Sequence, residues 1–127
     1  MTPENIASVT KLMETYFEGL YQADSSMLRN VFHPQLSYVC ATQGDELYLD
    51  LETYMARVEK RVPPAQKGEK RDDLILEMSF GGSRLAHVKA RMKLMGRDYL
   101  DYLTLIRSGD EWRIVAKIFA YVPVEVE

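Results

Sequence analysis

The chain has 127 residues, and its 16 basic and 19 acidic side chains give a formal net charge of -3. A chain of this length buries roughly two thirds of its unfolded surface, so its core needs no disulfide or metal to hold it together. The acidic balance disfavours nucleic-acid binding, which requires a broad basic surface. We therefore expect a single domain over residues 1–127, without metal or cofactor.

Cysteine content and hydropathy bear on the cellular compartment. The single cysteine, Cys40, excludes an intramolecular disulfide and any metal site built from paired cysteines. No stretch approaches the roughly 18 uninterrupted apolar residues of a membrane span, and the N-terminus lacks the basic lead and apolar run of a signal peptide. We expect a cytoplasmic protein that does not interact with a membrane.

Capping signals and apolar spacing predict helices in the first half. Thr2 and Pro3 are typical of a helix start, and apolar residues then recur every three or four positions up to Tyr21. Asp24 is expected to cap a second, shorter helix. This helix should end before Pro34, because proline disfavours helical geometry in the residue that precedes it. We expect the segment 32–34 to form the corner after this helix.

The corner contains His33, which is placed to bond the terminal carbonyls of the second helix or to line the mouth of a pocket. Residues 36–42 are β-branched and aromatic, which predicts a strand. Asp50 predicts the cap of a third helix. The expected inward face of that helix is Leu51, Tyr54, Met55, Val58 and Val62.

From residue 74 the apolar period changes from helical spacing to two, which predicts strands. Turn signals at 81–83, 96–98 and 108–111 divide this region into four consecutive antiparallel strands. The predicted class is therefore α+β, with N-terminal helices packed against an antiparallel sheet. The expected inward rows are Leu74, Leu76, Met78 and Phe80 in one strand and Ala86, Val88, Ala90, Met92 and Leu94 in the next.

The last predicted hairpin places an acid among apolar side chains. A turn over 108–111 sets four cross-strand pairs on one face, namely Arg107 with Trp112, Leu105 with Ile114, Leu103 with Ala116 and Asp101 with Ile118. Because this face is otherwise apolar, we expect helices to cover it and to bury Asp101. A buried carboxylate needs donors, water or a proton, since burying an unpaired charge costs several kcal/mol.

The opposite row of the last strand contains Val115, Phe119 and Tyr121. These residues would leave an apolar patch on the outer face of the sheet, which predicts a homodimer through that face.

Four segments resemble motifs of a known family: "YFEGLYQAD" at 16–24, "LRNVFHPQLS" at 28–37, "DYLTLI" at 101–106 and "WRIVAKIF" at 112–119. They resemble the putative lumazine-binding proteins, a branch of the nuclear transport factor 2-like superfamily. The family's motifs match Asp101-Tyr102-Leu103 and Phe32-His33-Pro34, and Tyr99 matches its aromatic two positions before the acid. The resemblance implies a cone-shaped, cystatin-like fold in which a strongly curved antiparallel sheet wraps a long N-terminal helix, encloses a pocket and usually forms a homodimer.

The same resemblance offers functional analogies. Superfamily relatives include ketosteroid isomerase, scytalone dehydratase, SnoaL-like polyketide cyclases and many binders without catalytic activity. In the enzymes, a carboxylate base in the cone works beside a donor for the developing oxyanion. The best analogues here are Asp101 and Tyr16, but no separate His-Asp pair typical of the cyclases or dehydratases is present. A purely structural role for Asp101 stays open.

Three functions remain compatible with the sequence. The first is a binding module for a small apolar or planar ligand; the second is an isomerase, dehydratase or cyclase in which Asp101 transfers a proton; the third is a dimeric assembly domain with a filled cone. The expected pocket lining is Tyr16, Leu20, Tyr38, Tyr54, Tyr99, Asp101 and Trp112, although aromatic residues at such spacings also serve as core.

Overall fold

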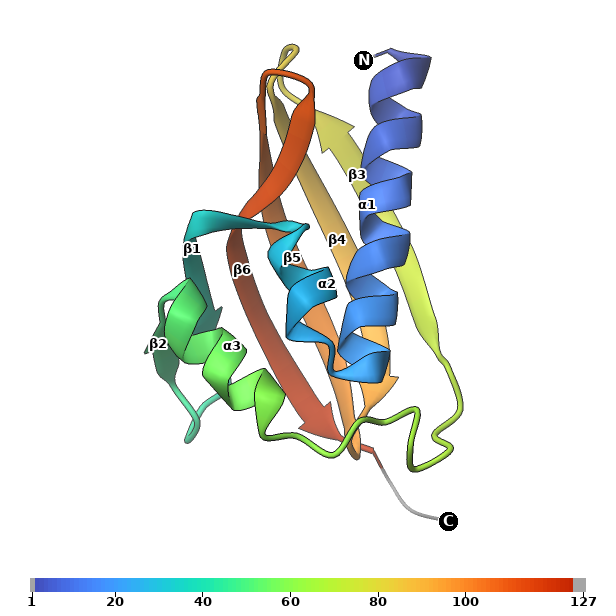
Figure 1. Ribbon diagram of the computed structural model, residues 1–127, viewed down its shortest axis with the longest axis vertical. Helices are drawn as coiled ribbons and strands as arrows, with labels where there is room; N and C mark the ends of the chain where they lie inside the picture. Colours follow the sequence, from blue (N-terminus) through green and yellow to red (C-terminus); the bar gives the residue numbers. More distant parts are fainter. Residues whose placement is uncertain (1, 125–127) are drawn as a thin grey trace.

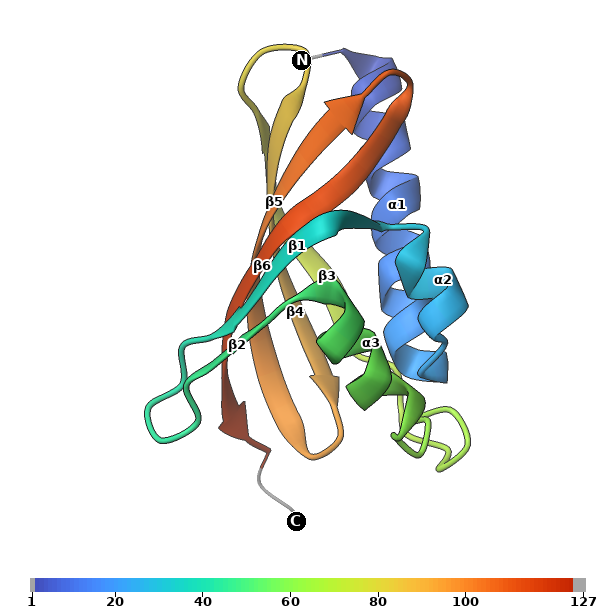
Figure 2. The same cartoon turned by 60° about the vertical axis from the view of Figure 1, so that its left-hand side comes forward.

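The computed structural model describes residues 2–124, in which three helices lie on one face of a six-stranded, strongly curved sheet (Figures 1 and 2). The strands lie in the order β2-β1-β6-β5-β4-β3. The elements in chain order are α1 (Pro3–Gln22), α2 (Ser25–Arg29), β1 (Phe32–Cys40), β2 (Leu47–Leu49), α3 (Leu51–Glu59), β3 (Asp73–Phe80), β4 (Leu85–Leu94), β5 (Arg97–Ser108) and β6 (Glu111–Pro123).

The helix starts agree with the capping signals. Thr2 Oγ1 accepts a hydrogen bond from the Asn5 backbone N–H at 3.1 Å, and Asp24 and Asp50 cap α2 and α3 in the same way. Helix α2 packs closely on α1 because residue 19 is glycine: a Cβ there would lie 2.8 Å from Leu28 Cδ2. The two helices thereby form one continuous layer over the sheet.

The sheet confirms the α+β cone and adds one feature to the expected antiparallel arrangement. Strands β3 to β6 form a consecutive antiparallel meander, whereas β1 pairs with β6 in parallel. The sheet is therefore mixed.

The prediction that residues 32–34 form a corner after the second helix is wrong. Helix α2 ends at Arg29, and Phe32, His33 and Pro34 are the first residues of β1. His33 Nδ1 accepts a hydrogen bond from the Gln35 backbone N–H at 3.0 Å, so its role is local to the strand. Val62 lies beyond the end of α3 and is exposed, contrary to expectation.

Irregular pairing in β3 changes which residues face the core. The register shifts between Ile75 and Glu77, so the inward side chains are Ile75 before the shift and Met78 and Phe80 after it. Leu74 and Leu76 are exposed, which corrects their predicted inward orientation. The neighbouring strand β4 is regular, and its predicted inward row is buried throughout.

A second register shift, between Thr104 and Leu105, has a larger consequence. On one side of it, Arg107 pairs with Trp112 and Leu105 with Ile114, as predicted. On the other side, β6 is displaced by one residue, and the predicted partners Ala116 and Ile118 are wrong. The observed pairs there are Leu103 with Lys117 and Asp101 with Phe119.

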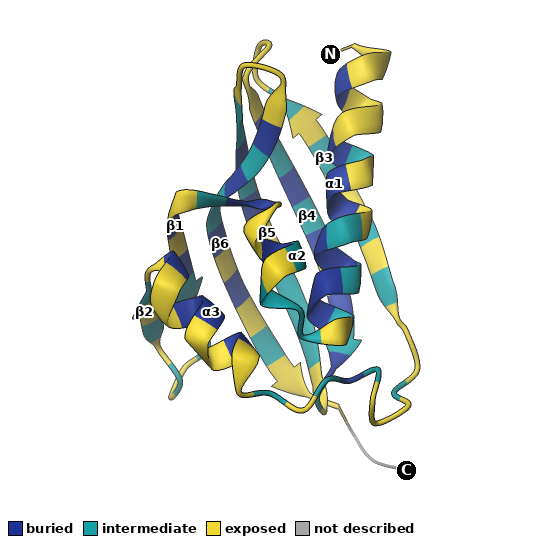
Figure 3. Ribbon diagram, in the orientation of Figure 1, coloured by how far each residue is buried: buried dark blue, intermediate teal, exposed yellow. Residues whose placement is uncertain are grey.

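The displacement turns Lys117 and Phe119 toward the helices and Ile118 toward the outer face. Buried residues follow the inner face of the sheet and the facing sides of the helices (Figure 3). In residues 2–124, no helix is both long and apolar enough to cross a bilayer.

Candidate functional site

Asp101 projects from the inner face of β5 and is 1% exposed. Its Oδ2 accepts a hydrogen bond from the Tyr16 hydroxyl of α1 at 2.5 Å. Its Oδ1 is also buried, and no group in residues 2–124 donates a hydrogen bond to it. The carboxyl group therefore has one atom committed to the fold and one acceptor atom available to another donor.

Burial and the neighbouring charge of Asp101 raise the pKa of Tyr16 well above its ordinary value. Tyr16 consequently keeps its proton near neutral pH, and its hydroxyl donates a hydrogen bond to the carboxylate. Burial likewise raises the pKa of Tyr38 to about 12 and raises that of Tyr54. These tyrosines provide hydroxyl donors, and none of them is a base at neutral pH.

Lys117 is a buried cation that the sequence-based prediction missed. Its side chain is directed inward by the register shift in β6, is 5% exposed, and donates a hydrogen bond to Tyr54 Oη at 3.1 Å. The ammonium also lies 5.0 Å from the ring centroid of Tyr16 and 5.4 Å from that of Phe119. Contacts of this kind stabilise a cation away from water. Lys117 is the one charged residue in the apolar run 114–120, a signal that could have found it.

These polar groups lie around a small inner cavity of about 20 Å³, enough for about one water molecule. Five of the predicted site residues line it: Leu20, Tyr38, Tyr54, Tyr99 and Asp101. Six further residues complete the lining: Arg61, Met92, Leu94, Met95, Lys117 and Phe119. Tyr16 contacts the cavity indirectly, through its hydrogen bond to Asp101.

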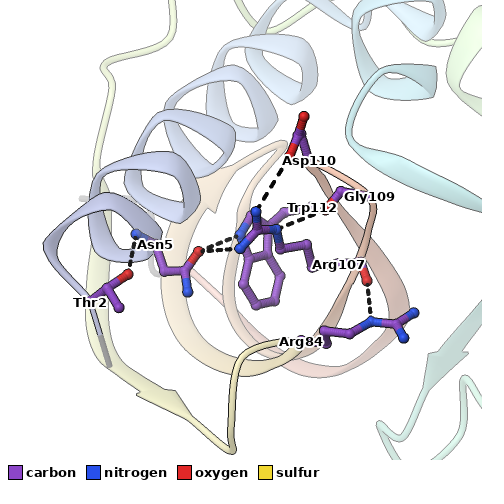
Figure 4. Close-up of polar contacts among 7 residues, drawn as sticks. All are labelled: Thr2, Asn5, Arg84, Arg107, Gly109, Asp110 and Trp112. Atoms are coloured by element: carbon purple, nitrogen blue, oxygen red, sulfur yellow. Dashed lines mark hydrogen bonds and ion pairs between the residues drawn. The ribbon is translucent and has the colours of Figure 1, made fainter.

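Trp112 does not lie with the other candidates. Its indole N–H donates to Asn5 Oδ1 at 3.4 Å, and Arg107 Nη1 donates to the same oxygen at 3.2 Å (Figure 4). The ring packs edge-on against Phe80, with 5.9 Å between centroids. Trp112 thus belongs to the end of the cone where the start of α1 meets the β5–β6 turn (Figure 1). We call it the closed end because these side chains are hydrogen-bonded across it; a surface hollow of about 400 Å³ beside it is lined in part by Leu12, Val31 and Trp112.

A larger outer cavity of about 470 Å³ opens at the other end of the cone. It shares Tyr38, Arg61, Met95, Tyr99 and Phe119 with the inner cavity, so the two are adjacent. The remaining lining residues are Cys40, Asp45, Leu47, Arg57, Lys60, Arg97 and Tyr121. None of these seven was predicted to line the pocket, because they come from the β1–β2 hairpin, the end of α3 and the adjoining ends of β5 and β6, which only the folded chain brings together.

The family model described as "Putative lumazine-binding" matches residues 4–120. The chain belongs to this family. Its fold is that of the nuclear transport factor 2-like superfamily, as the sequence motifs predicted. The search of curated proteins gave no match.

Several solved structures share the fold. A protein of unknown function from Silicibacter pomeroyi, described as NTF-2 like, is 24% identical with a TM-score of 0.80, and the alignment covers 96% of this chain and 100% of that one. An NTF2-like protein of unknown function from Shewanella baltica is 17% identical with a TM-score of 0.85, covering 97% and 98%. A cystatin-like fold protein from Burkholderia xenovorans is 18% identical with a TM-score of 0.75, covering 98% and 96%.

The side chains of the two cavities define the contacts that the site offers to a ligand. The inner end offers a carboxylate acceptor at Asp101 and an ammonium donor at Lys117. The walls are aromatic, and the entrance is basic. Among residues 2–124, no group of three or more His, Cys, Asp or Glu side chains is arranged to hold a metal ion.

Proposed function

We propose that this protein, as a single domain over residues 1–127, binds a small planar molecule in the outer cavity, with the inner cavity as its polar end. The observation that carries the proposal is that the two cavities are adjacent. The aromatic walls and basic entrance of the outer cavity thereby connect to the buried Asp101 and Lys117. The family description supports ligand binding in general, and the ligand itself is left open.

The dimensions favour a compact ligand. The outer cavity of about 470 Å³ falls within the range of roughly 300–1,000 Å³ that small-molecule sites occupy. Apolar and aromatic walls would supply most of the affinity, while Asp101 and Lys117 would fix the orientation of the bound molecule. This division of roles is typical of binding sites that are formed before the ligand arrives.

Proton-transfer catalysis by Asp101 is the second candidate, and one observation favours it. The carboxylate is held by Tyr16 while its Oδ1 accepts no hydrogen bond from residues 2–124, an arrangement that suits an acid or base in an apolar site. The inner cavity beside it has room for about one water molecule, so a reacting carbon would reach Oδ1 only if the walls moved. We therefore place binding first.

A homodimer through the outer sheet face is the assembly we propose, with a surface that differs from the predicted one. Phe119 is buried and Tyr121 lines the outer cavity, so neither forms the outer patch. The apolar side chains exposed on that face include Tyr102, Ile118 and Val122 of β5 and β6, and Tyr102 pairs directly with Ile118. The single buried Cys40 remains compatible with a reducing compartment such as the cytoplasm.

A thermal-shift screen of planar metabolites tests the binding proposal. Wild type is compared with Leu47→Trp, which fills the outer cavity, and with Leu74→Trp, which adds the same indole at an exposed position away from it. We expect compounds that raise the melting temperature of wild type and of Leu74→Trp but not of Leu47→Trp. Stabilisation of all three proteins alike would contradict binding in this cavity.

The variant Asp101→Asn separates binding from catalysis. It keeps the side-chain shape and an oxygen that accepts from Tyr16, while it removes the charge and the base. A binding protein is expected to change its affinity for hits from the screen, whereas an enzyme would lose turnover of a hit by orders of magnitude with its fold intact. A lower melting temperature as the sole effect would assign Asp101 a structural role.

Sedimentation at micromolar concentration tests the dimer. We expect wild type and the control Val62→Asp, at an exposed residue outside the sheet, to sediment as dimers and Ile118→Asp to sediment as a monomer, because the new charge would be buried in the contact. A monomeric wild type would exclude this assembly.

A further inference from the structure

We propose that the ligand is an anion, with a carboxylate or phosphate bound by the basic rim of the outer cavity and a flat neutral body against the aromatic wall. The basic rim consists of Arg57, Lys60, Arg61 and Arg97. This inference rests on the proposed function, since it names the chemical class of molecule that the same cavity would take.

The cations of the basic rim lack carboxylate partners. Within residues 2–124, none of the four lies within ion-pair distance of an acid. Seven other basic residues of the same chain do form ion pairs: Arg29, Lys67, Arg71, Arg91, Lys93, Arg107 and Arg113. Of the nine basic residues outside these ion pairs (16 minus seven), four form the basic rim and Lys117 lies in the adjacent inner cavity, so five of the nine gather at the two cavities; the others are Lys11, Lys70, Arg84 and Lys89.

The one acid in the lining, Asp45, offsets only part of the positive charge of the basic rim. Asp45 Oδ2 accepts a hydrogen bond from the Tyr121 hydroxyl at 2.5 Å. Four cations and one acid thus line an opening in a chain whose formal net charge is -3. A cleft lined by one sign of charge concentrates ions of the opposite sign, which makes this entrance attractive to an anion.

Stabilisation of helix α3 explains the positions of only some cations of the basic rim. Arg57 lies in the last turn of α3 and Lys60 caps it, where cations also favour the helix dipole. Arg97 has no such reason to be there, because it is the first residue of β5 and reaches the cavity from the other side. Convergence of cations from two separate elements favours a binding role.

The wall next to the basic rim is suited to a flat body. The ring of Tyr99 lies 5.8 Å from that of Phe119 and 5.6 Å from that of Tyr121, measured between centroids. The Arg97 guanidinium lies 4.1 Å from the Tyr121 centroid, so charge and aromatic surface meet at the entrance. A planar anion could contact both at once.

The inner end determines which way the molecule points. Asp101 carries an acceptor oxygen without a donor among residues 2–124, and the buried ammonium of Lys117 in the same cavity offsets its charge, whereas the basic rim carries an excess of cations. The anion therefore lies at the basic rim, and the neutral end of the ligand points a hydrogen-bond donor toward Asp101 through the water-sized inner cavity.

Two fluorescent probes of similar shape test the charge preference: 8-anilinonaphthalene-1-sulfonate, which is anionic, and N-phenyl-1-naphthylamine, which is neutral. Each is titrated into wild type, into the double variant Lys60→Gln/Arg97→Gln and into Lys11→Gln, whose exposed lysine lies at the closed end. We expect the double variant to weaken binding of the anion by about fivefold or more and that of the neutral probe by less than about twofold. Lys11→Gln should change neither value.

The same titrations on Leu47→Trp distinguish the two possible failures. Equal binding of both probes, blocked by Leu47→Trp but insensitive to the double variant, would overturn the anion preference and leave small-molecule binding in place. Binding of neither probe, or binding that Leu47→Trp does not reduce, would overturn the proposed function and with it the anion preference. If the double variant loses binding of the anionic probe alone, the result supports both the anion preference and the proposed function.

Discussion

The polar side chains at the two ends of the cone differ in whether they have partners within the fold. At the closed end, Arg107 and the Trp112 indole both donate hydrogen bonds to Asn5 Oδ1 and hold the start of α1 against the β5–β6 turn (Figure 4). At the open end, within residues 2–124, the basic rim lacks carboxylate partners and one oxygen of Asp101 accepts no hydrogen bond. The difference indicates that the closed end stabilises the fold while the open end is available to a ligand.

The largest effect should come from removing the centre of the closed end. Trp112→Ala is expected to lower the free energy of unfolding by roughly 3–5 kcal/mol, because the ring is 4% exposed and its loss leaves a cavity. Urea denaturation followed by circular dichroism measures this, since the variant has no tryptophan left to report by fluorescence. Tyr48→Ala, at a side chain that is 76% exposed, is the control. A loss below about 1 kcal/mol would remove Trp112 from the core.

A smaller loss of unfolding free energy is expected when the hydrogen-bond acceptor at the closed end, Asn5, is removed. Asn5→Ala should cost about 1–3 kcal/mol, because the Trp112 indole N–H and the Arg107 guanidinium lose their shared acceptor. Glu4→Ala, one position earlier on the exposed side of α1, is the matched control for helix propensity. If the two variants unfold at the same denaturant concentration, the hydrogen bonds to Asn5 contribute nothing to the closed end.

The tyrosines at the open end should make the fold sensitive to alkali. Burial raises the pKa of Tyr38 to about 12, so above pH 10 the unfolded chain loses a proton that the folded chain keeps. Stability therefore falls as the pH rises from 10 through 12, by about 1.4 kcal/mol at pH 11 from this side chain alone. Tyr38→Phe should reduce the difference in unfolding free energy between pH 9 and pH 11 by that amount. An unchanged difference would show that Tyr38 ionises as it does in water.

The smallest effect on stability is expected at the basic rim. Arg97→Gln should lower the free energy of unfolding by only about 0.5 kcal/mol, because the guanidinium has no carboxylate partner within residues 2–124 and loses only an exposed contact with the Tyr121 ring and a long hydrogen bond to Tyr99. Arg91→Gln, which breaks a bidentate pair with Asp98 on the same β4–β5 hairpin, is the comparison and should cost more. A loss at Arg97 larger than that at Arg91 would mean that the basic rim serves the fold.

Signals that depend on neighbouring residues were sufficient to predict most of the elements. Thr2, Asp24 and Asp50 cap the three helices, and the alternation from Ala86 to Leu94 predicted the inward face of β4. These features are local, because capping and alternation act over a few residues.

The site was only partly predictable, because two register shifts reverse the alternation within a strand. The shift beside Leu105 brings Lys117 and Phe119 inward, and a simple count from the turn at 108–111 places both wrongly. Asp101 was predicted correctly as a buried acid, since β5 itself alternates without interruption. The outer cavity depends on long-range contacts among the β1–β2 turn, α3 and β5, for which the chain carries no local signal.

The most direct test of ligand binding at the open end is a ¹H–¹⁵N correlation spectrum recorded during titration with 8-anilinonaphthalene-1-sulfonate. We predict that the shifted backbone amides are those of Tyr38, Arg61, Arg97, Tyr99 and Phe119. The one indole resonance of the chain, from Trp112 at the closed end, should stay in place. Shifts centred on Trp112, or on Ile118 and Val122 of the outer sheet face, would contradict the assignment of the open end as the ligand site.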